Sequence, residues 1–213
     1  MDYTIKLPKE VYKIFSVIEE YGSEAYVVGG CVRDSILGRD IHDWDICTPV
    51  IVSELIPLFE EKGYYVILTG LQHGTITVMI GGIGYEITTF RRDSDYTDHR
   101  HPNNVEFTSN LIEDLSRRDF TMNAIAYNPT VGIVDPFHGL DDINNRVIRC
   151  VRNPVDRFSE DALRILRAIR FACQLDFNID TAIGWTIGYT DIKKTLKYVS
   201  AERIQSELLK MIV

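Results

Sequence analysis

Two short blocks near the N-terminus carry the residue types best suited to chemistry in this chain. In Gly29-Gly30-Cys31-Val32-Arg33-Asp34, a glycine turn comes just before a predicted helix, and Arg33 falls in the first turns of that helix. Backbone N–H groups at a helix start, together with a guanidinium, favour the binding of an anion such as a polyphosphate. Gly29, Gly30 and Arg33 are therefore candidate nucleotide-binding residues.

The second block, Asp43-Trp44-Asp45, is expected on a strand that spans residues 42–47. Residues i and i+2 of a strand share a face, so Asp43 and Asp45 should lie side by side. Two such carboxylates repel each other and need a divalent cation, and oxygen ligands favour Mg²⁺ or Mn²⁺. A phosphate cradle beside metal carboxylates indicates phosphoryl or nucleotidyl transfer.

A third carboxylate often completes a two-metal site of this kind. Glu86 is the only acid within the strands expected at 64–69, 75–80 and 85–90, which should form an antiparallel meander. We expect Glu86 to join Asp43 and Asp45 as a catalytic residue. The alternative is an exposed glutamate on an edge strand.

Two later blocks combine arginines with a carboxylate. In Arg117-Arg118-Asp119-Phe120-Thr121-Met122-Asn123, the carboxylate and the amide are four residues apart and are expected on one helical face, where the block could serve phosphate and ribose. The alternative is a capped helix with a salt bridge. Nucleotide-binding candidates here are Arg118, Asp119 and Asn123.

The other block, Glu160-Asp161-Ala162-Leu163-Arg164, begins a predicted helix over 160–175. Asp161 can accept a hydrogen bond from an exocyclic amino group while Arg164 donates to the adjacent ring acceptor. Cytosine and adenine present that pattern, whereas uracil and guanine present its reverse. An intrahelical ion pair is the alternative, and Arg167 and Arg170 are further nucleotide-binding candidates on the same helix.

Hydrophobic spacing indicates how these blocks are positioned. Helices are expected at 9–21, 32–37, 52–62, 160–175, 181–188 and 200–212, and a short buried strand at 25–28 leads into the glycine turn. Strand signals fade beyond residue 146, so the predicted fold class is α+β, with a mixed or antiparallel β-sheet flanked by helices and an all-helical segment after it. The predicted domains are 1–148 and 149–213.

Composition is that of a soluble globular protein, and charge is unevenly distributed. The net charge of −8 divides into −12 for residues 1–145 and +4 for residues 146–213, which fits a polyanion held mainly by the last third. A solvated helical surface explains that charge equally well. Four scattered cysteines without a CxxC spacing favour a reduced, cytoplasmic setting, and neither a membrane span nor a signal peptide is expected.

Taken together, the blocks resemble the family of class II tRNA nucleotidyltransferases and bacterial poly(A) polymerases. The matching stretches are GGCVRD with DWD, then RRDFTMNAIAY, DPFHGLDD, EDALRILRAIRFA and SAERIQSELL, in family order over residues 27–209. The resemblance implies a nucleotidyltransferase head that holds metal at Asp43 and Asp45 and a helical neck that reads the incoming base. It further implies ribose recognition by Asp119, and the segment 200–208 would brace the neck. The family's helical body and tail regions are not expected in this chain.

The function implied is Mg²⁺-dependent, template-independent addition of C or A from CTP and ATP to an RNA 3′ end, most simply that of tRNA. The polar segment 92–102 resembles the family's flexible loop needed for adding A. A poly(A) polymerase shares the same motifs and is the nearest alternative. A nucleotide-binding module without transferase activity, lacking the RNA-binding regions, is an alternative from another class.

Overall fold

A computed structural model describes residues 3–68, 70–93, 105–189 and 191–212, which form two compact units. The first unit comprises Met1–Arg92, Val105–Leu115 and Ile125–Pro136, and the second is built mainly from Ser116–Ala124 and Phe137–Val213. The chain thus passes between the units more than once, because β8 and β9 return to the sheet of the first unit. A functional division into a head (1–148) and a neck (149–213) stays a prediction.

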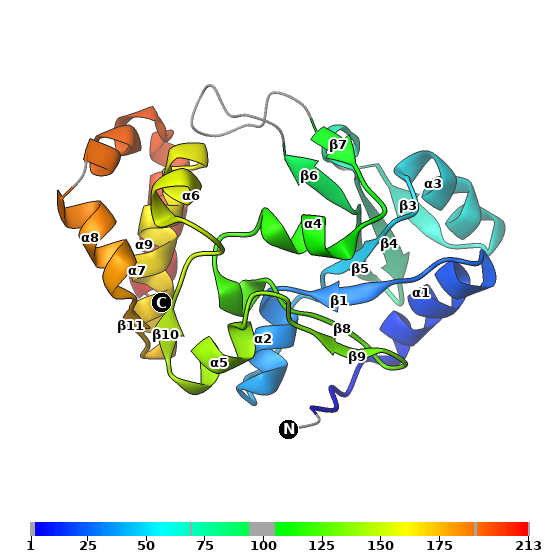
Figure 1. The fold of residues 1–213 in the computed structure, drawn as a ribbon. Helices are drawn as coiled ribbons and strands as arrows, with labels where there is room; N and C mark the ends of the chain where they lie inside the picture. Colours follow the sequence, from blue (N-terminus) through cyan, green and yellow to red (C-terminus); the bar gives the residue numbers. More distant parts are fainter. Residues whose placement is uncertain (1–2, 69, 94–104, 190, 213) are drawn as a thin grey trace. The chain divides into compact units, whose positions relative to one another are not determined.

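The first unit is built on a seven-stranded mixed sheet with the strand order β3-β4-β5-β2-β1-β8-β9 (Figure 1). β2 pairs with β5 in parallel, and every other neighbouring pair in this sheet is antiparallel. The expected meander and the α+β fold class are confirmed. The strands are β1 (Tyr26–Val28), β2 (Ile46–Thr48), β3 (Tyr65–Ile67), β4 (Thr75–Ile80), β5 (Ile83–Thr89), β8 (Ala126–Asn128) and β9 (Gly132–Val134).

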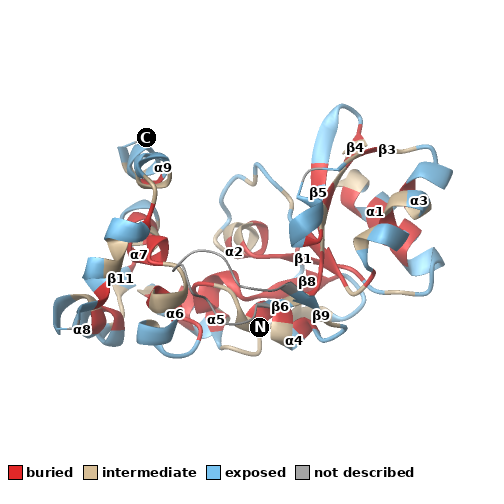
Figure 2. Cartoon of the chain, turned by 90° about the horizontal axis from the view of Figure 1, so that it is seen from above, coloured by how far each residue is buried: buried red, intermediate tan, exposed pale blue. Residues whose placement is uncertain are grey.

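Helices of this unit pack their apolar stripes inward, as the periodicity predicts. In α1, the residues at helical spacing, Val11, Ile14 and Ile18, are fully buried, and Figure 2 shows the buried and exposed faces of α1. The helical elements are α1 (Lys9–Glu20), α2 (Gly30–Ile36), α3 (Val52–Glu61), the 3₁₀ helix η1 (Leu71–His73) and α4 (Leu111–Ser116), and a separate strand pair is formed by β6 (Arg91–Asp93) and β7 (Val105–Phe107). Residues 94–104, which hold most of the proposed flexible loop, lie outside the described residues.

Two predicted boundaries in the first unit are wrong. The Asp43-Trp44-Asp45 block precedes β2 rather than lying on it. The neighbouring strand β1 ends at Val28, whose N–H donates to Asp45 O (3.0 Å), and the chain then turns away at Gly29. Likewise α2 begins at Gly30 and not at residue 32. Gly29 has φ +83° and ψ −129°, a conformation suited to glycine, so the chain turns directly from β1 into the helix.

The second unit is mostly helical, and two short strands pair in parallel within it. One of them, Asn178–Ile179, lies in the segment 149–213 that was predicted to be all helical, so that prediction is wrong at this strand. The predicted helix over 160–175 is also divided. Asp161 is extended, with φ −140° and ψ 104°, and its carboxylate accepts a hydrogen bond from Leu163 N (3.1 Å), which begins a new helix. The elements are η2 (Thr121–Asn123), α5 (Gly139–Asn144), β10 (Val147–Ile148), α6 (Pro154–Glu160), α7 (Leu163–Leu175), β11 (Asn178–Ile179), α8 (Thr181–Tyr189), η3 (Asp191–Tyr198) and α9 (Ala201–Ile212).

The turn at Gly29 supports a stability prediction. Gly29→Ala should lower the free energy of unfolding by about 1–3 kcal/mol, because alanine is strained at this φ and ψ. Urea titration followed by circular dichroism measures the change. Gly184→Ala is the matched control: Gly184 lies within α8 with open space around its Cα, so alanine there should stabilise by about 0.5–1 kcal/mol. Equal effects of the two substitutions would contradict the proposed strain.

Candidate nucleotide and metal site

The glycine turn and the predicted phosphate-binding arginine lie together in the first unit. A Cβ on Gly30 would stand 3.7 Å from Nη2 of Arg33, so the guanidinium is directly beside the turn. Arg33 is buried, and its Nε and Nη2 donate to the two carboxylate oxygens of Asp34 (2.9 and 2.7 Å). Sequence reasoning did not assign Asp34 a role, although its adjacency to Arg33 was visible. The carboxylate holds the arginine in one orientation.

Asp43 and Asp45 are both exposed in the segment just before β2, which begins at Ile46. Ile46 pairs with Ile87, so Asp45 and Glu86 each come one residue before a pair of the parallel ladder. Glu86 is exposed on β5, where it pairs with Thr77 of β4. Across the described ranges, no group of three His, Cys, Asp or Glu side chains is placed to hold a metal ion. A catalytic role of Glu86 stays a prediction.

The donor set at Asp43 and Asp45 nevertheless fits magnesium. Mg²⁺ dehydrates reluctantly and is usually held by one or two carboxylates, its remaining positions being filled by water and substrate phosphate oxygens. Both carboxylates are accessible to such an ion, and their oxygen donors match its preference. Two carboxylates are therefore sufficient protein ligands, with or without Glu86.

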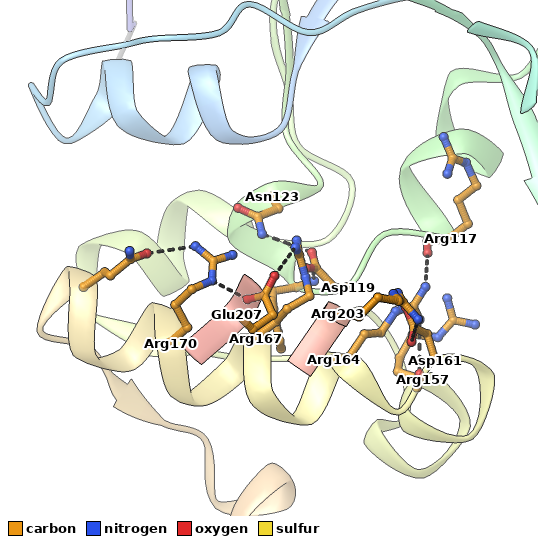
Figure 3. A network of polar contacts seen from close by, with 12 residues as sticks. Arg117, Asp119, Asn123, Arg157, Asp161, Arg164, Arg167, Arg170, Arg203 and Glu207 are labelled. Carbon is orange, nitrogen blue, oxygen red and sulfur yellow. Dashed lines mark hydrogen bonds and ion pairs between the residues drawn. The ribbon is translucent and has the colours of Figure 1, made fainter. Parts of the chain in front are cut away.

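In the second unit, Asp119 is the centre of a buried polar network (Figure 3). Its Oδ2 accepts two hydrogen bonds from Arg167 (Nε 2.8 Å, Nη2 2.6 Å), and its Oδ1 accepts from Asn123 Nδ2 (3.0 Å) and Phe120 N (2.8 Å). Burial alone would raise the pKa of Asp119, but Arg167, Asn123 and Arg164 outweigh it and hold that pKa well below its ordinary value.

The prediction that Asp119 and Asn123 share one face of a helix is wrong. Asp119 precedes the short 3₁₀ helix η2 and is followed by Phe120 in an extended conformation. Asn123 still meets Asp119, because the turn folds the amide back onto the carboxylate. Arg118 is half-buried next to Asp119 in the chain, and its contact with phosphate, like the ribose contact of Asp119, stays a prediction.

Asp161 and Arg164 each bind a different partner, so the alternative of an ion pair between their side chains is wrong. Arg164 is buried and donates to Glu160 Oε2 (2.7 Å) and to the carbonyl oxygens of Arg157 (3.3 Å) and Arg117 (3.0 Å). Asp161 accepts from Arg203 of α9. The two side chains stand at the junction of α6 and α7, held separately, as Figure 3 shows.

Arg167 and Arg170 share a second acid, Glu207 of α9. Arg170 Nε donates to Glu207 Oε2 (2.6 Å), Arg167 Nη1 lies 3.8 Å from Glu207 Oε1, and the Arg170 guanidinium stands 4.0 Å from the ring centre of Phe171. Sequence reasoning did not single out Arg203 and Glu207. Their spacing of four on one helix, which places them on one face, was the available signal.

Comparison with known proteins identifies the family. The poly(A) polymerase head domain matches residues 25–149, more than half of the chain. The chain belongs to the poly(A) polymerase head-domain family. A curated relative, the CCA-adding enzyme of Oceanobacillus iheyensis, is 48% identical over 200 residues, which are 93% of this chain and 48% of that protein.

Two solved structures resemble this member of the head-domain family over most of its length. The CCA-adding enzyme of Bacillus stearothermophilus in complex with CTP is 39% identical, with a TM-score of 0.85 over 96% of this chain and 48% of that one. A tRNA nucleotidyltransferase complexed with a primer tRNA and an incoming ATP analogue is 32% identical, with a TM-score of 0.73 over 93% and 58%. The chain thus spans about half the length of these relatives. In the described part, no helix is long and apolar enough to cross a membrane.

The Asp119 network gives a pH-dependent stability prediction. The pKa of Asp119 is depressed in the folded protein. The contribution of its ionised carboxylate to the free energy of unfolding should therefore be complete above the ordinary pKa of 3.8 and should be lost as pH falls below that value. Asp119→Asn should lower the free energy of unfolding by about 3 kcal/mol at pH 7, because Arg167 loses a buried partner. Urea titrations from pH 7 to pH 3 measure the free energy of unfolding. The difference in that free energy between Asp119→Asn and the unsubstituted protein should become smaller below pH 4. The control is Asp176→Asn, an exposed acid at the end of α7, which should change little at any pH. A difference in the free energy of unfolding that stays constant with pH would contradict the lowered pKa of Asp119.

Proposed function

We propose that this chain carries the catalytic and base-reading portion of a Mg²⁺-dependent, template-independent nucleotidyltransferase that adds C and A to the 3′ end of tRNA. The observation that supports this most strongly is the likeness to a CCA-adding enzyme crystallised with CTP, at 39% identity over 96% of the chain. CTP, ATP and tRNA are the proposed substrates, and their chemistry makes the cytoplasm the proposed setting.

In the proposed reaction, the RNA 3′-hydroxyl oxygen attacks the α-phosphorus of CTP or ATP. A new phosphodiester bond forms and the proton of the 3′-hydroxyl is released to water. The bond from the α-phosphorus to the bridging oxygen of the β-phosphate breaks, and pyrophosphate leaves with the electron pair. Asp43 and Asp45 would hold the metal, with Glu86 assisting, and Arg33 and Arg118 would bind the triphosphate. When bound, Mg²⁺ supplies charge neutralisation at the phosphate oxygens and favours ionisation of the hydroxyl. The protein itself contributes positioning and electrostatics.

Base choice is assigned to the second unit. Asp161 and Arg164 stand at the start of α7 with their backbones joined by a hydrogen bond from Arg164 N to Asp161 O (3.0 Å). A carboxylate acceptor beside a guanidinium donor matches cytosine and adenine and opposes uracil and guanine. Arg167, Arg170, Asp119 and Asn123 are the further proposed nucleotide-binding residues, with Asp119 assigned to the ribose. Arg167 and Asn123 are hydrogen-bonded to Asp119, and Arg170 to Glu207.

Primer extension tests the proposed function. A labelled tRNA that ends before CCA, incubated with the chain, Mg²⁺ and both CTP and ATP, should gain two C and one A. A long run of A would instead indicate a poly(A) polymerase. Intact binding of CTP and ATP with no extension of any RNA would contradict transfer by this chain and favour the nucleotide-binding module.

The metal assignment is tested separately. Asp43→Ala should reduce nucleotide transfer by at least about 10³-fold, because the developing charge would lose its metal clamp. Single-turnover extension of the same tRNA measures this, and circular dichroism checks that the variant is folded. Asp40→Ala is a matched control, since Asp40 is an exposed acid three residues earlier. Transfer by Asp43→Ala at the level of Asp40→Ala would refute the metal role.

A further inference from the structure

The base-reading carboxylate has a partner in a distant helix. Arg203 of α9 donates to both oxygens of Asp161, from Nη2 to Oδ2 (2.8 Å) and from Nη1 to Oδ1 (3.3 Å). This is the two-point geometry in which a guanidinium fixes the plane of a carboxylate as well as its position. The two residues are 42 apart in sequence, so the contact is made by the fold of the second unit.

A small apolar cluster sets the two backbones that carry this pair. Ala162, Leu163 and Val199 are buried together, with Leu166, Leu196 and Ile204 packed against them. Ala162 follows Asp161 and Ile204 follows Arg203, so the cluster anchors the residue next to each member of the pair. Packing therefore places Arg203 next to Asp161, and its two guanidinium nitrogens fix the orientation of the carboxylate.

The hydrogen bonds leave Asp161 able to accept one more. An ionised carboxylate has about four acceptor positions. Leu163 N and the two Arg203 nitrogens occupy three of them, two on Oδ1 and one on Oδ2. The remaining position is on Oδ2, and the Asp161 side chain keeps 18% of its surface exposed. One acceptor in a fixed direction is what recognition of a single amino group requires.

We propose that Arg203 is a specificity-determining positioning residue: by gripping both oxygens of Asp161, it aims the free acceptor position of Oδ2 at the exocyclic amino group of cytosine or adenine. The inference rests on the proposed function, because it assigns Arg203 a role through the proposed base reader. It does not place Arg203 in contact with substrate.

Stability alone is a weaker account of this ion pair. Both side chains are partly exposed, 26% for Arg203 and 18% for Asp161, so water screens part of the stability that the pair could contribute to folding. An arginine that served only to brace α9 would affect the binding of every nucleotide equally. A positioning arginine should alter the preference between nucleotides that differ in their amino groups.

The test is the ratio of the dissociation constants for UTP and CTP, measured by isothermal titration calorimetry on the full chain with Mg²⁺. Arg203→Gln should reduce the preference for CTP about tenfold, chiefly by weakening the binding of CTP. A well-placed polar pair discriminates between bases by about that factor. Arg203→Lys keeps the positive charge but loses the two-point hydrogen bonding. Its ratio of dissociation constants should lie between those of the unsubstituted protein and Arg203→Gln. Lys210→Gln removes an exposed positive charge from the same helix and should leave the ratio unchanged.

A double variant separates positioning from bracing. Asp161→Ala should itself reduce the ratio, and adding Arg203→Gln to it should change the ratio no further, because Arg203 would then have no carboxylate to aim. Two outcomes would overturn the inference and leave the proposed function standing. In the first, Arg203→Gln weakens the binding of CTP and of UTP equally. In the second, Asp161→Ala lowers the ratio of the UTP and CTP dissociation constants, whereas Arg203→Gln leaves it within about twofold of the unsubstituted protein. A ratio near one in the unsubstituted protein would overturn the base-reading assignment and the inference with it.

Discussion

The arrangement of the second unit depends on a buried row of alternating charges: Asp119, Arg167, Glu207 and Arg170. Three of these four residues are less than 10% exposed, and isolated charges in such surroundings would be strongly destabilising. Each charge is tolerated only because the next one is within hydrogen-bonding or ion-pairing distance. The row therefore fixes the turn that carries Asp119 against α7, and α7 against α9. A shift of either helix by one turn would leave a charge buried without its partner.

The buried row of charges also constrains the proposed base-reading residues. Because Glu207 sets the register of α9, it also sets the position of Arg203 one turn earlier, and hence the carboxylate of Asp161. Arg164 is fixed on its other side by Glu160 and two backbone carbonyl oxygens. Reading a base by hydrogen bonds needs groups that do not reorient to suit the wrong base. The charged row supplies that rigidity from residues away from the reading pair.

Local spacing predicted much of this fold, and it failed where a partner from elsewhere decides the outcome. α1 and β4 follow from their periods of 3.6 and 2 and were placed within one residue. The start of β2 was misplaced because it depends on where β1 ends, which the Asp43-Trp44-Asp45 block does not encode. The contacts of Arg203 and Glu207 could not be predicted for the same reason, because their partners lie 42 and 37 residues away in sequence. The break at Asp161 is local, and the helical spacing of the residues around it concealed it. Residue types that suit a nucleotide were visible, whereas the side chains that hold them were not.

Because charge is unevenly distributed along the chain, the proposed phosphate binding and the proposed base reading face different electrostatic conditions. Residues 1–145 carry a net charge of −12, so a triphosphate approaching Asp43 and Asp45 meets repulsion that Arg33, already bound to Asp34, offsets only in part. Asp43 and Asp45 would hold a divalent cation, whose positive charge would offset that repulsion. The proposed base reading at Asp161 and Arg164 would involve a neutral heterocycle in a segment of net charge +4, and it would need no such ion. The metal should therefore govern how tightly the phosphates are held, while α7 and α9 govern which base is accepted.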